Sequence, residues 1–187
     1  MKTANIRKII KAQKAFTLVE LLVVIAVLAV LAAAVLVAIN PVEQINRGKD
    51  ASRLSTVSQV GHALSQYAVN NSSSTNVYPQ ATAAWMTALT PNEIQSLVSV
   101  PQAANGCSFN QVGNGICYNS ATSPAGAIVW TVLESNSENV KAGNGAVCGS
   151  GKVPAAIWDS TLGKVGVACI AGGANSLTPG TITLNQP

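Results

Sequence analysis

The chain has few of the side chains on which catalysis and metal binding usually depend. Only 10% of its 187 residues are charged, and it has a single histidine, His62. A serine nucleophile needs a histidine base beside it, and His62 falls in a region whose periodicity predicts a helix. One histidine also offers a metal no second imidazole ligand. We therefore predict that the chain is not an enzyme and uses no cofactor.

Acidic residues are scarce in the C-terminal part. After Val140 the only acid is Asp159, whereas a calcium site needs several clustered oxygen ligands, so no metal site is expected. Residues 145–152 come close to a phosphate-binding loop. Their spacing is wrong by one residue, however, and Val153 stands where that loop requires Ser or Thr. No nucleotide site is expected.

Positive charge is concentrated at the N-terminus. Residues 1–15 contain five basic residues and no acid, whereas residues 16–187 contain six basic and seven acidic residues. The net charge of +4 therefore belongs to the leader. Binding to nucleic acid needs a basic patch that neutralises phosphates, and none remains after Ala15. No specific nucleic-acid partner is predicted.

A long apolar segment follows this basic start. Between Phe16 and Ile39 the only charged residue is Glu20, and residues 21–39 are an apolar run of 19. A secretory signal peptide has an apolar run of about 7–15 residues, which is shorter than this one. A plain membrane anchor explains the length, because 16–39 as a helix spans about 36 Å at about 1.5 Å per residue. It explains neither Glu20 nor the sharp boundary at Phe16.

The residues around that boundary form a motif, Ala15-Phe16-Thr17-Leu18-Val19-Glu20-Leu21-Leu22. Together with the lysine-rich leader and the apolar run, it resembles the processing site of type IV pilins and pseudopilins. The resemblance implies that a prepilin peptidase cuts between Ala15 and Phe16 and methylates the new amino terminus at Phe16. The family usually has glycine before the cut, and alanine has the next smallest side chain.

The resemblance also implies a role for Glu20 in assembly. A carboxylate in an apolar medium needs a partner, and residues 16 and 20 lie on one face of a helix. In filaments of the family that partner is the amino terminus of a neighbouring subunit, so one charge per subunit sets the register along the fibre. The alternative is a glutamate that only reaches the lipid headgroups from a helix end.

A proline divides the expected helix into two halves. Pro41 interrupts the helical pattern, which resumes with apolar residues three and four positions apart as far as about residue 69. Residues 16–40 are expected to form the transmembrane or filament-core half, and residues 41–70 an amphipathic half. Polar side chains of this second half, including Asp50 and Arg53, are expected mostly on the faces away from its apolar stripe.

The remaining residues, 71–187, are predicted to form a globular head. Short helices are expected across Trp85, Met86 and Leu89 and again over 90–98, where Thr90 and Pro91 look like a helix start. Strands are expected over 115–120, 127–133, 155–159 and 164–170, the last two forming a hairpin, with an edge strand possible at 181–184. The fold class is thus α+β: a long helix, bent near Pro41, packed against a small antiparallel sheet, as in pilins.

Four cysteines lie in the predicted head: Cys107, Cys117, Cys148 and Cys169. An even number of cysteines after an export signal indicates two disulfides in an oxidising compartment. Three pairings are possible. We favour 107–117, which brackets a Gly- and Asn-rich stretch, and 148–169, in which the second cysteine lies on the predicted hairpin.

The sequence as a whole predicts a pilin-like structural subunit. It starts as a single-pass membrane protein in contact with lipid, with its head outside the cytoplasm. The expected partners are prepilin peptidase, the assembly machinery in the membrane, and further copies of the same chain in an extracellular filament. One alternative is a pseudopilin of a type II secretion or DNA-uptake machine. An alternative of another class is a membrane-anchored binding domain that never polymerises.

Overall fold

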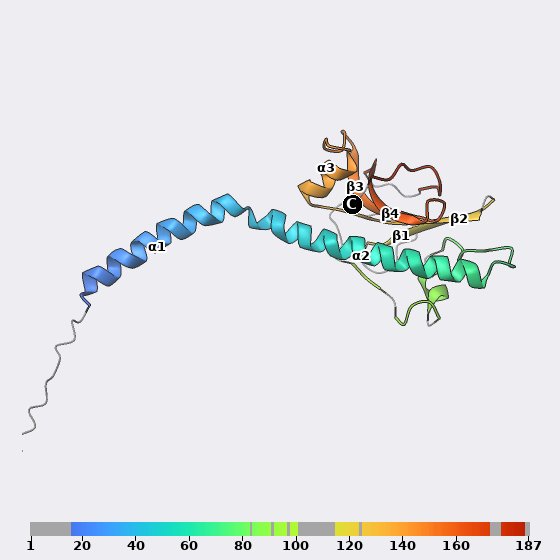
Figure 1. Cartoon of the computed structure of the whole chain (residues 1–187), viewed down its shortest axis with the longest axis horizontal. Helices are drawn as coiled ribbons and strands as arrows, with labels where there is room; N and C mark the ends of the chain where they lie inside the picture. Colours follow the sequence, from blue (N-terminus) through green and yellow to red (C-terminus); the bar gives the residue numbers. More distant parts are fainter. Residues whose placement is uncertain are drawn as a thin grey trace, which may run out of the picture. The chain divides into compact units, whose positions relative to one another are not determined.

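The computed structural model describes residues 16–82, 84–90, 92–96, 98–100, 115–123, 125–172 and 177–185. The chain divides into two compact units, Met1–Pro41 and Val42–Pro187. The first contains helix α1 (Leu18–Ile39), and the second contains nearly all of helix α2 (Pro41–Asn70) and the head. The architecture is α+β, a long N-terminal helix followed by a small antiparallel sheet, as the sequence predicts (Figure 1).

The long helix is interrupted at a single residue. Helix α1 ends at Ile39, and Asn40 adopts a left-handed conformation with a φ of 47°. Asparagine tolerates this conformation better than most residues do. Helix α2 then begins with Pro41, which suits a first helical position because its φ is already helical and no N–H is needed there. The Asn-Pro pair therefore ends one helix and starts the next.

The head is built on one four-stranded sheet. Its strands are β1 (Cys117–Thr122), β2 (Ala125–Val132), β3 (Lys152–Asp159) and β4 (Lys164–Ala171). They lie in chain order and every neighbouring pair is antiparallel. The β3–β4 hairpin turns at Gly163, whose φ of 63° favours glycine. All four predicted strands are present, with ends displaced by up to three residues.

One face of the sheet packs against α2. The helix buries Val57, Val60, Gly61, Ala63 and Leu64, of which Val57, Val60 and Leu64 follow one another at spacings of three and four. On the sheet, Tyr118, Val129 and Trp158 are paired across β1, β2 and β3 and belong to the same buried cluster. A Cβ atom on Gly61 would overlap the ring of Trp158. Glycine is therefore what lets the indole lie directly on the helix backbone.

The other face of the sheet is covered by the C-terminal segment. Leu177, Ile182 and Leu184 pack on a second buried cluster that includes Trp130 and Ile157. The edge strand considered at 181–184 does not form, since none of these four residues lies in a strand. The next residue, Asn185, makes an isolated bridge with Val167.

Buried Asp159 ties this C-terminal segment to the β3–β4 turn. Its side chain accepts hydrogen bonds from the Thr161 N–H (2.8 Å), the Thr161 hydroxyl (2.7 Å) and the Gly180 N–H (2.7 Å). These bonds satisfy a carboxylate that is shielded from water, and they hold residue 180 beside the hairpin.

One of the two short helices predicted in the head is present and the other is not. The helix across Trp85–Leu89 is confirmed as a 3₁₀ helix. The helix predicted over 90–98 is wrong: none of residues 92–96 is helical, and the N–H groups of Glu93 and Ile94 both donate to the Leu89 carbonyl. Pro91 and Leu97 lie outside the described residues. The chain closes a turn at Leu89, and Ile94 then packs against the core.

Helix α3 (Asn136–Ala142) was not anticipated. It starts with the Ser135 hydroxyl accepting from the Glu138 N–H at 3.3 Å. Ser followed three residues later by Glu is a readable helix start, but the helix is only seven residues long and has no apolar period of its own. Its first turn is completed by a residue distant in sequence, since the Glu43 carboxylate accepts from the N–H groups of Asn136 and Ser137 at 3.1 and 3.3 Å.

A buried ion pair on α2 was placed on the wrong face by the sequence pattern. Asp50 and Arg53 are fully buried, with 2.7 Å between Oδ1 and Nη1. The Asp50 carboxylate also accepts from the N–H groups of Glu134 and Ser135, and the Glu134 side chain lies 3.3 Å from Arg53. The positions 50, 53, 57, 60 and 64 continue one stripe. The period was correct, and only the polarity argued against burial.

We expect Gly61→Ala to destabilise the head by about 1–3 kcal/mol or more, since an added methyl group overlaps Trp158 and overpacks the core. The matched control is Gly48→Ala in the same helix, where no atom lies within 4 Å of the added Cβ. There alanine should stabilise by about 0.5–1 kcal/mol, because it has the better helix propensity. Urea denaturation of the full chain in mild detergent, followed by tryptophan fluorescence, measures both. Equal effects at the two sites would contradict the contact.

We expect Asp50→Asn to cost about 3–5 kcal/mol, because it leaves the Arg53 guanidinium buried without its closest countercharge. Glu43→Gln is the control: its carboxylate also binds backbone N–H groups, but it is partly exposed and should cost about 1 kcal/mol. The N–H of Asn136 holds the pKa of Glu43 below its usual value. The contribution of Glu43 is therefore present above the unfolded pKa and lost as the pH falls through the folded one. A smaller loss for Asp50→Asn than for Glu43→Gln would refute this ranking.

Candidate functional site

The start of α1 is closed by a reciprocal pair of side chains. The Thr17 hydroxyl accepts from the Glu20 N–H at 3.2 Å. In return, Glu20 Oε2 accepts from the Thr17 N–H and from the Thr17 hydroxyl, each at 2.9 Å. This capping box satisfies donors that the first turn of a helix would otherwise leave unpaired. It fixes Leu18 as the first helical residue, two positions after Phe16.

The capping box shows a second role for Glu20 that the sequence analysis missed. The signal was present, because Thr followed three residues later by Glu before an apolar run is typical of a helix start. Both bonds from Thr17 end on Oε2. Among the described residues, no hydrogen bond reaches Oε1. One oxygen of Glu20 therefore caps its own helix while the other remains accessible.

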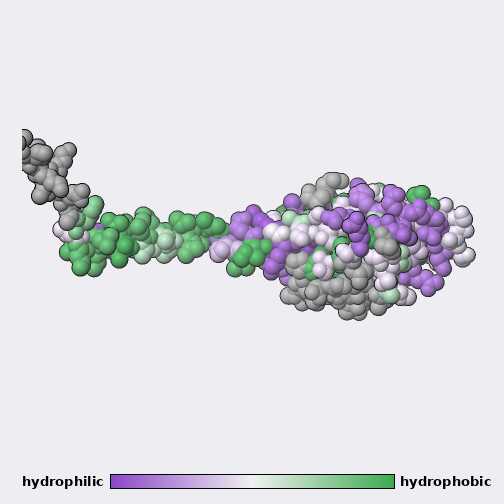
Figure 2. Space-filling view, turned by 90° about the horizontal axis from the view of Figure 1, so that it is seen from below, coloured by the Kyte–Doolittle hydropathy of each residue, from purple (hydrophilic) through white to green (hydrophobic). Residues whose placement is uncertain are grey.

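The surface of α1 is apolar on every side. None of its 22 residues is buried, and its large apolar side chains are from 52% to 86% exposed. Figure 2 shows hydrophobic residues covering the helix in that view. Of the described helices, α1 alone is long and apolar enough to cross a membrane, a test that some soluble helices and signal sequences also pass. Phe16, just before the helix, is 87% exposed.

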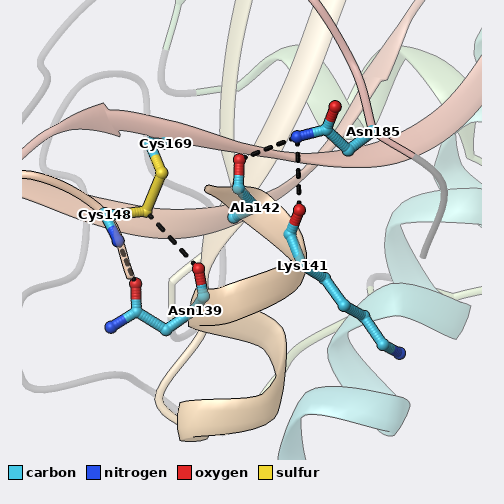
Figure 3. The surroundings of a disulfide bond; sticks show 6 residues. All are labelled: Asn139, Lys141, Ala142, Cys148, Cys169 and Asn185. Atoms are coloured by element: carbon cyan, nitrogen blue, oxygen red, sulfur yellow. Dashed lines mark hydrogen bonds between the residues drawn. A yellow bond between two sulfur atoms is a disulfide. The ribbon is translucent and has the colours of Figure 1, made fainter. Parts of the chain in front are cut away.

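The head carries a disulfide between Cys148 and Cys169, the second of the two favoured pairs (Figure 3). It joins the loop after α3 to strand β4. The Asn139 side chain accepts from the Cys148 N–H at 2.9 Å, so α3 also positions the bridge. Asn185 donates to the carbonyls of Lys141 (3.2 Å) and Ala142 (2.8 Å) and closes the C-terminal end of α3.

The other site residues named from sequence are placed as follows. Cys117 is disulfide-bonded, but its expected partner, Cys107, lies outside the described residues, as does Ala15. His62 is exposed on α2. No group of three or more His, Cys, Asp or Glu residues that could hold a metal occurs within the described ranges. The buried carboxylates of Asp50 and Asp159 are occupied by the bonds that hold the head together.

Residues 10–36 match the family model of the prokaryotic N-terminal methylation motif. Neither a curated protein nor a solved structure matches the chain. The matched segment contains the predicted cleavage site, the Thr17–Glu20 capping box and most of α1. The chain therefore carries the leader signature of type IV pilins and pseudopilins.

Proposed function

We propose that the chain is the precursor of a filament subunit. A prepilin peptidase cleaves it between Ala15 and Phe16 and methylates Phe16, and the mature chain polymerises through α1 into an extracellular fibre. The observation that carries this proposal is the match of the methylation motif to a helix with no buried residue, which starts directly after the expected cut. The Cys148–Cys169 disulfide supports a head outside the cytoplasm, since disulfides persist in oxidising compartments.

The apolar surface of α1 fits two environments in turn, first the lipid bilayer and then the core of a filament. At about 1.5 Å per residue its 22 residues span about 33 Å, which suits a hydrocarbon core of about 30 Å. Lipid can cover all sides of the helix in the membrane. Outside the membrane, the large apolar side chains of α1 would face water on every side, which is unfavourable. In a homopolymer, the α1 helices of neighbouring subunits cover them.

The side chain of Glu20 offers a polar contact through which these helices would dock. Its Oε2 is used by Thr17, whereas Oε1 can accept a further donor without breaking the cap. The positive amine produced at Phe16 of a neighbouring subunit is the donor that processing creates. An amine and a carboxylate that meet in an apolar fibre core each satisfy a charge that is otherwise costly to bury. The pair thus favours one register over its neighbours.

We expect the mature protein to begin at Phe16. Its intact mass should correspond to residues 16–187 with two disulfides and one added methyl group, because the peptidase acts at the Ala15–Phe16 bond. Mass spectrometry of protein purified from cells tests this. Ala15→Gly should give the same product, whereas Ala15→Leu should retain the leader, since a bulky side chain replaces a small one at the cut. A wild-type protein that keeps residues 1–15 would contradict the proposal.

We expect Glu20→Ala and Glu20→Gln to be processed normally but to lower the assembled fraction at least about tenfold. An unpaired buried charge costs several kcal/mol, and about 1.4 kcal/mol is already a factor of ten. The glutamine variant is informative because its carbonyl can still accept from Thr17, so it removes the charge and keeps the cap. Sheared surface fibres counted by electron microscopy provide the measurement, and Thr17→Ser is the control with an intact cap.

The Glu20→Gln result separates two explanations. If Glu20→Gln cells make normal fibres while Glu20→Ala cells do not, Glu20 acts only as a helix cap. If both variants make normal fibres, the docking role is refuted. A wild-type chain that is processed but extracts only as a monomer and forms no fibre favours a membrane-anchored domain that does not polymerise.

A further inference from the structure

A small cavity lies between the segment after α2 and the end of β1. Its volume is about 190 Å³, and its walls are five residues between 76 and 81 and residues 120–122. Sites for drug-sized ligands typically measure about 300–1,000 Å³, so this cavity suits a single small ring. Nothing in the proposed filament function uses it.

The walls of the cavity are fixed by bonds between the two segments. The Pro79 carbonyl accepts from the Tyr118 hydroxyl at 2.8 Å and from the Ser120 hydroxyl at 2.9 Å. Burial raises the pKa of the Tyr118 hydroxyl, which therefore keeps its proton and remains a donor. The Trp85 ring stacks on Tyr118 with 4.3 Å between ring centroids. The cavity is thus held open by the core and does not depend on a ligand to form.

Hydrogen-bonding groups in the lining are available to a ligand. The side-chain amides of Asn76 and Gln80 and the hydroxyl of Thr122 are exposed. Across the residues that the structure describes, these three side chains have no hydrogen bond. Each amide offers donors and an acceptor, and the hydroxyl offers both. Half-buried Tyr78 packs against the core and also lines the cavity, where an aromatic side chain offers apolar surface and a hydroxyl group.

Charge decides which chemical class fits. None of the lining residues is charged. A phosphate, carboxylate or ammonium group would lose hydration on entry and meet no opposite charge. A purely apolar ligand would leave the amides without partners. A neutral ring with several hydroxyl groups and an apolar C–H face satisfies both the amides and the aromatic wall.

We propose that this cavity binds one ring of a neutral carbohydrate. The C–H face of the sugar lies against Tyr78, and its hydroxyl groups exchange hydrogen bonds with Asn76, Gln80 and Thr122. The site belongs to the head alone, within the unit that starts at Val42.

Saturation-transfer difference NMR on the full chain in detergent tests the proposal. The probes are methyl β-D-galactoside, methyl α-D-mannoside and N-acetyl-D-glucosamine, with glucuronic acid and glucosamine as charged counterparts. We expect transfer to at least one neutral sugar and weaker transfer to both charged ones. The double variant Gln80→Ala, Thr122→Ala should bind about tenfold more weakly, as expected for the loss of two neutral hydrogen bonds.

The control is Gln44→Ala, which removes an exposed glutamine at the opposite end of α2 and should bind as the wild type does. Tryptophan fluorescence shows whether the double variant keeps its fold. Absence of transfer to all three neutral sugars overturns the proposal. Equal transfer to the charged sugars, or equal binding by a folded double variant, overturns it as well. Because the measurement uses monomers in detergent, its failure is distinguishable from a failure of filament assembly.

Discussion

The buried Asp50 carboxylate is the interaction on which the rest of the head depends. It lies on the face of α2 that is turned to the core and binds three donors: the Arg53 guanidinium and the N–H groups of Glu134 and Ser135. These two N–H groups belong to the chain between β2 and α3. One turn of α2 therefore binds the chain at the point where β2 has ended and α3 begins. Glu43, seven residues earlier, binds the first turn of α3 and extends the same connection.

Along α2 the contact with the head changes from polar to apolar. After Arg53 the buried positions are Val57, Val60, Gly61, Ala63 and Leu64, and the Trp158 ring lies against Gly61. The polar contacts fix the direction of bonded groups, whereas the apolar contacts supply buried area. A sheet gains independent stability when a hydrophobic face is covered, for example by a helix. With α2 on one face and the C-terminal segment on the other, the sheet is buried on both sides.

The two helices differ in what they need from other molecules. The head buries one face of α2, whereas no described part of the chain buries a residue of α1. The Thr17–Glu20 capping box gives α1 a defined first turn before any partner is present and leaves one carboxylate oxygen accessible. A subunit of this kind combines a domain that is complete by itself with a helix that must be covered by something else. The sugar-sized cavity beside Tyr78 lies in the complete part, so its occupancy does not require assembly.

Local rules of sequence were sufficient for much of this protein. The basic leader, the apolar run, Glu20 and the Asn-Pro interruption are all contiguous, and each follows from short-range chemistry. The same holds for the four strands, whose β-branched and aromatic residues are grouped in short runs. The capping box at Thr17 was equally local and could have been predicted. The helix predicted after Thr90 failed because a helix-start signal does not exclude a closed turn when Ile94 packs on the core.

What the sequence determined by itself was the order of a basic N-terminal segment, an apolar helix, an amphipathic helix and antiparallel strands, because polarity and period are properties of neighbouring residues. Only the tertiary structure decided that Asp50 and Arg53 are buried, that Glu43 caps α3, and that Tyr118 and Ser120 hold Pro79 beside a cavity. Each of these contacts joins residues about 40 to 90 positions apart, or places polar side chains on a face that polarity alone assigns to water. A charge can be buried at low cost only when the fold brings binding groups from distant segments next to it. A local sequence pattern does not show which distant groups those are.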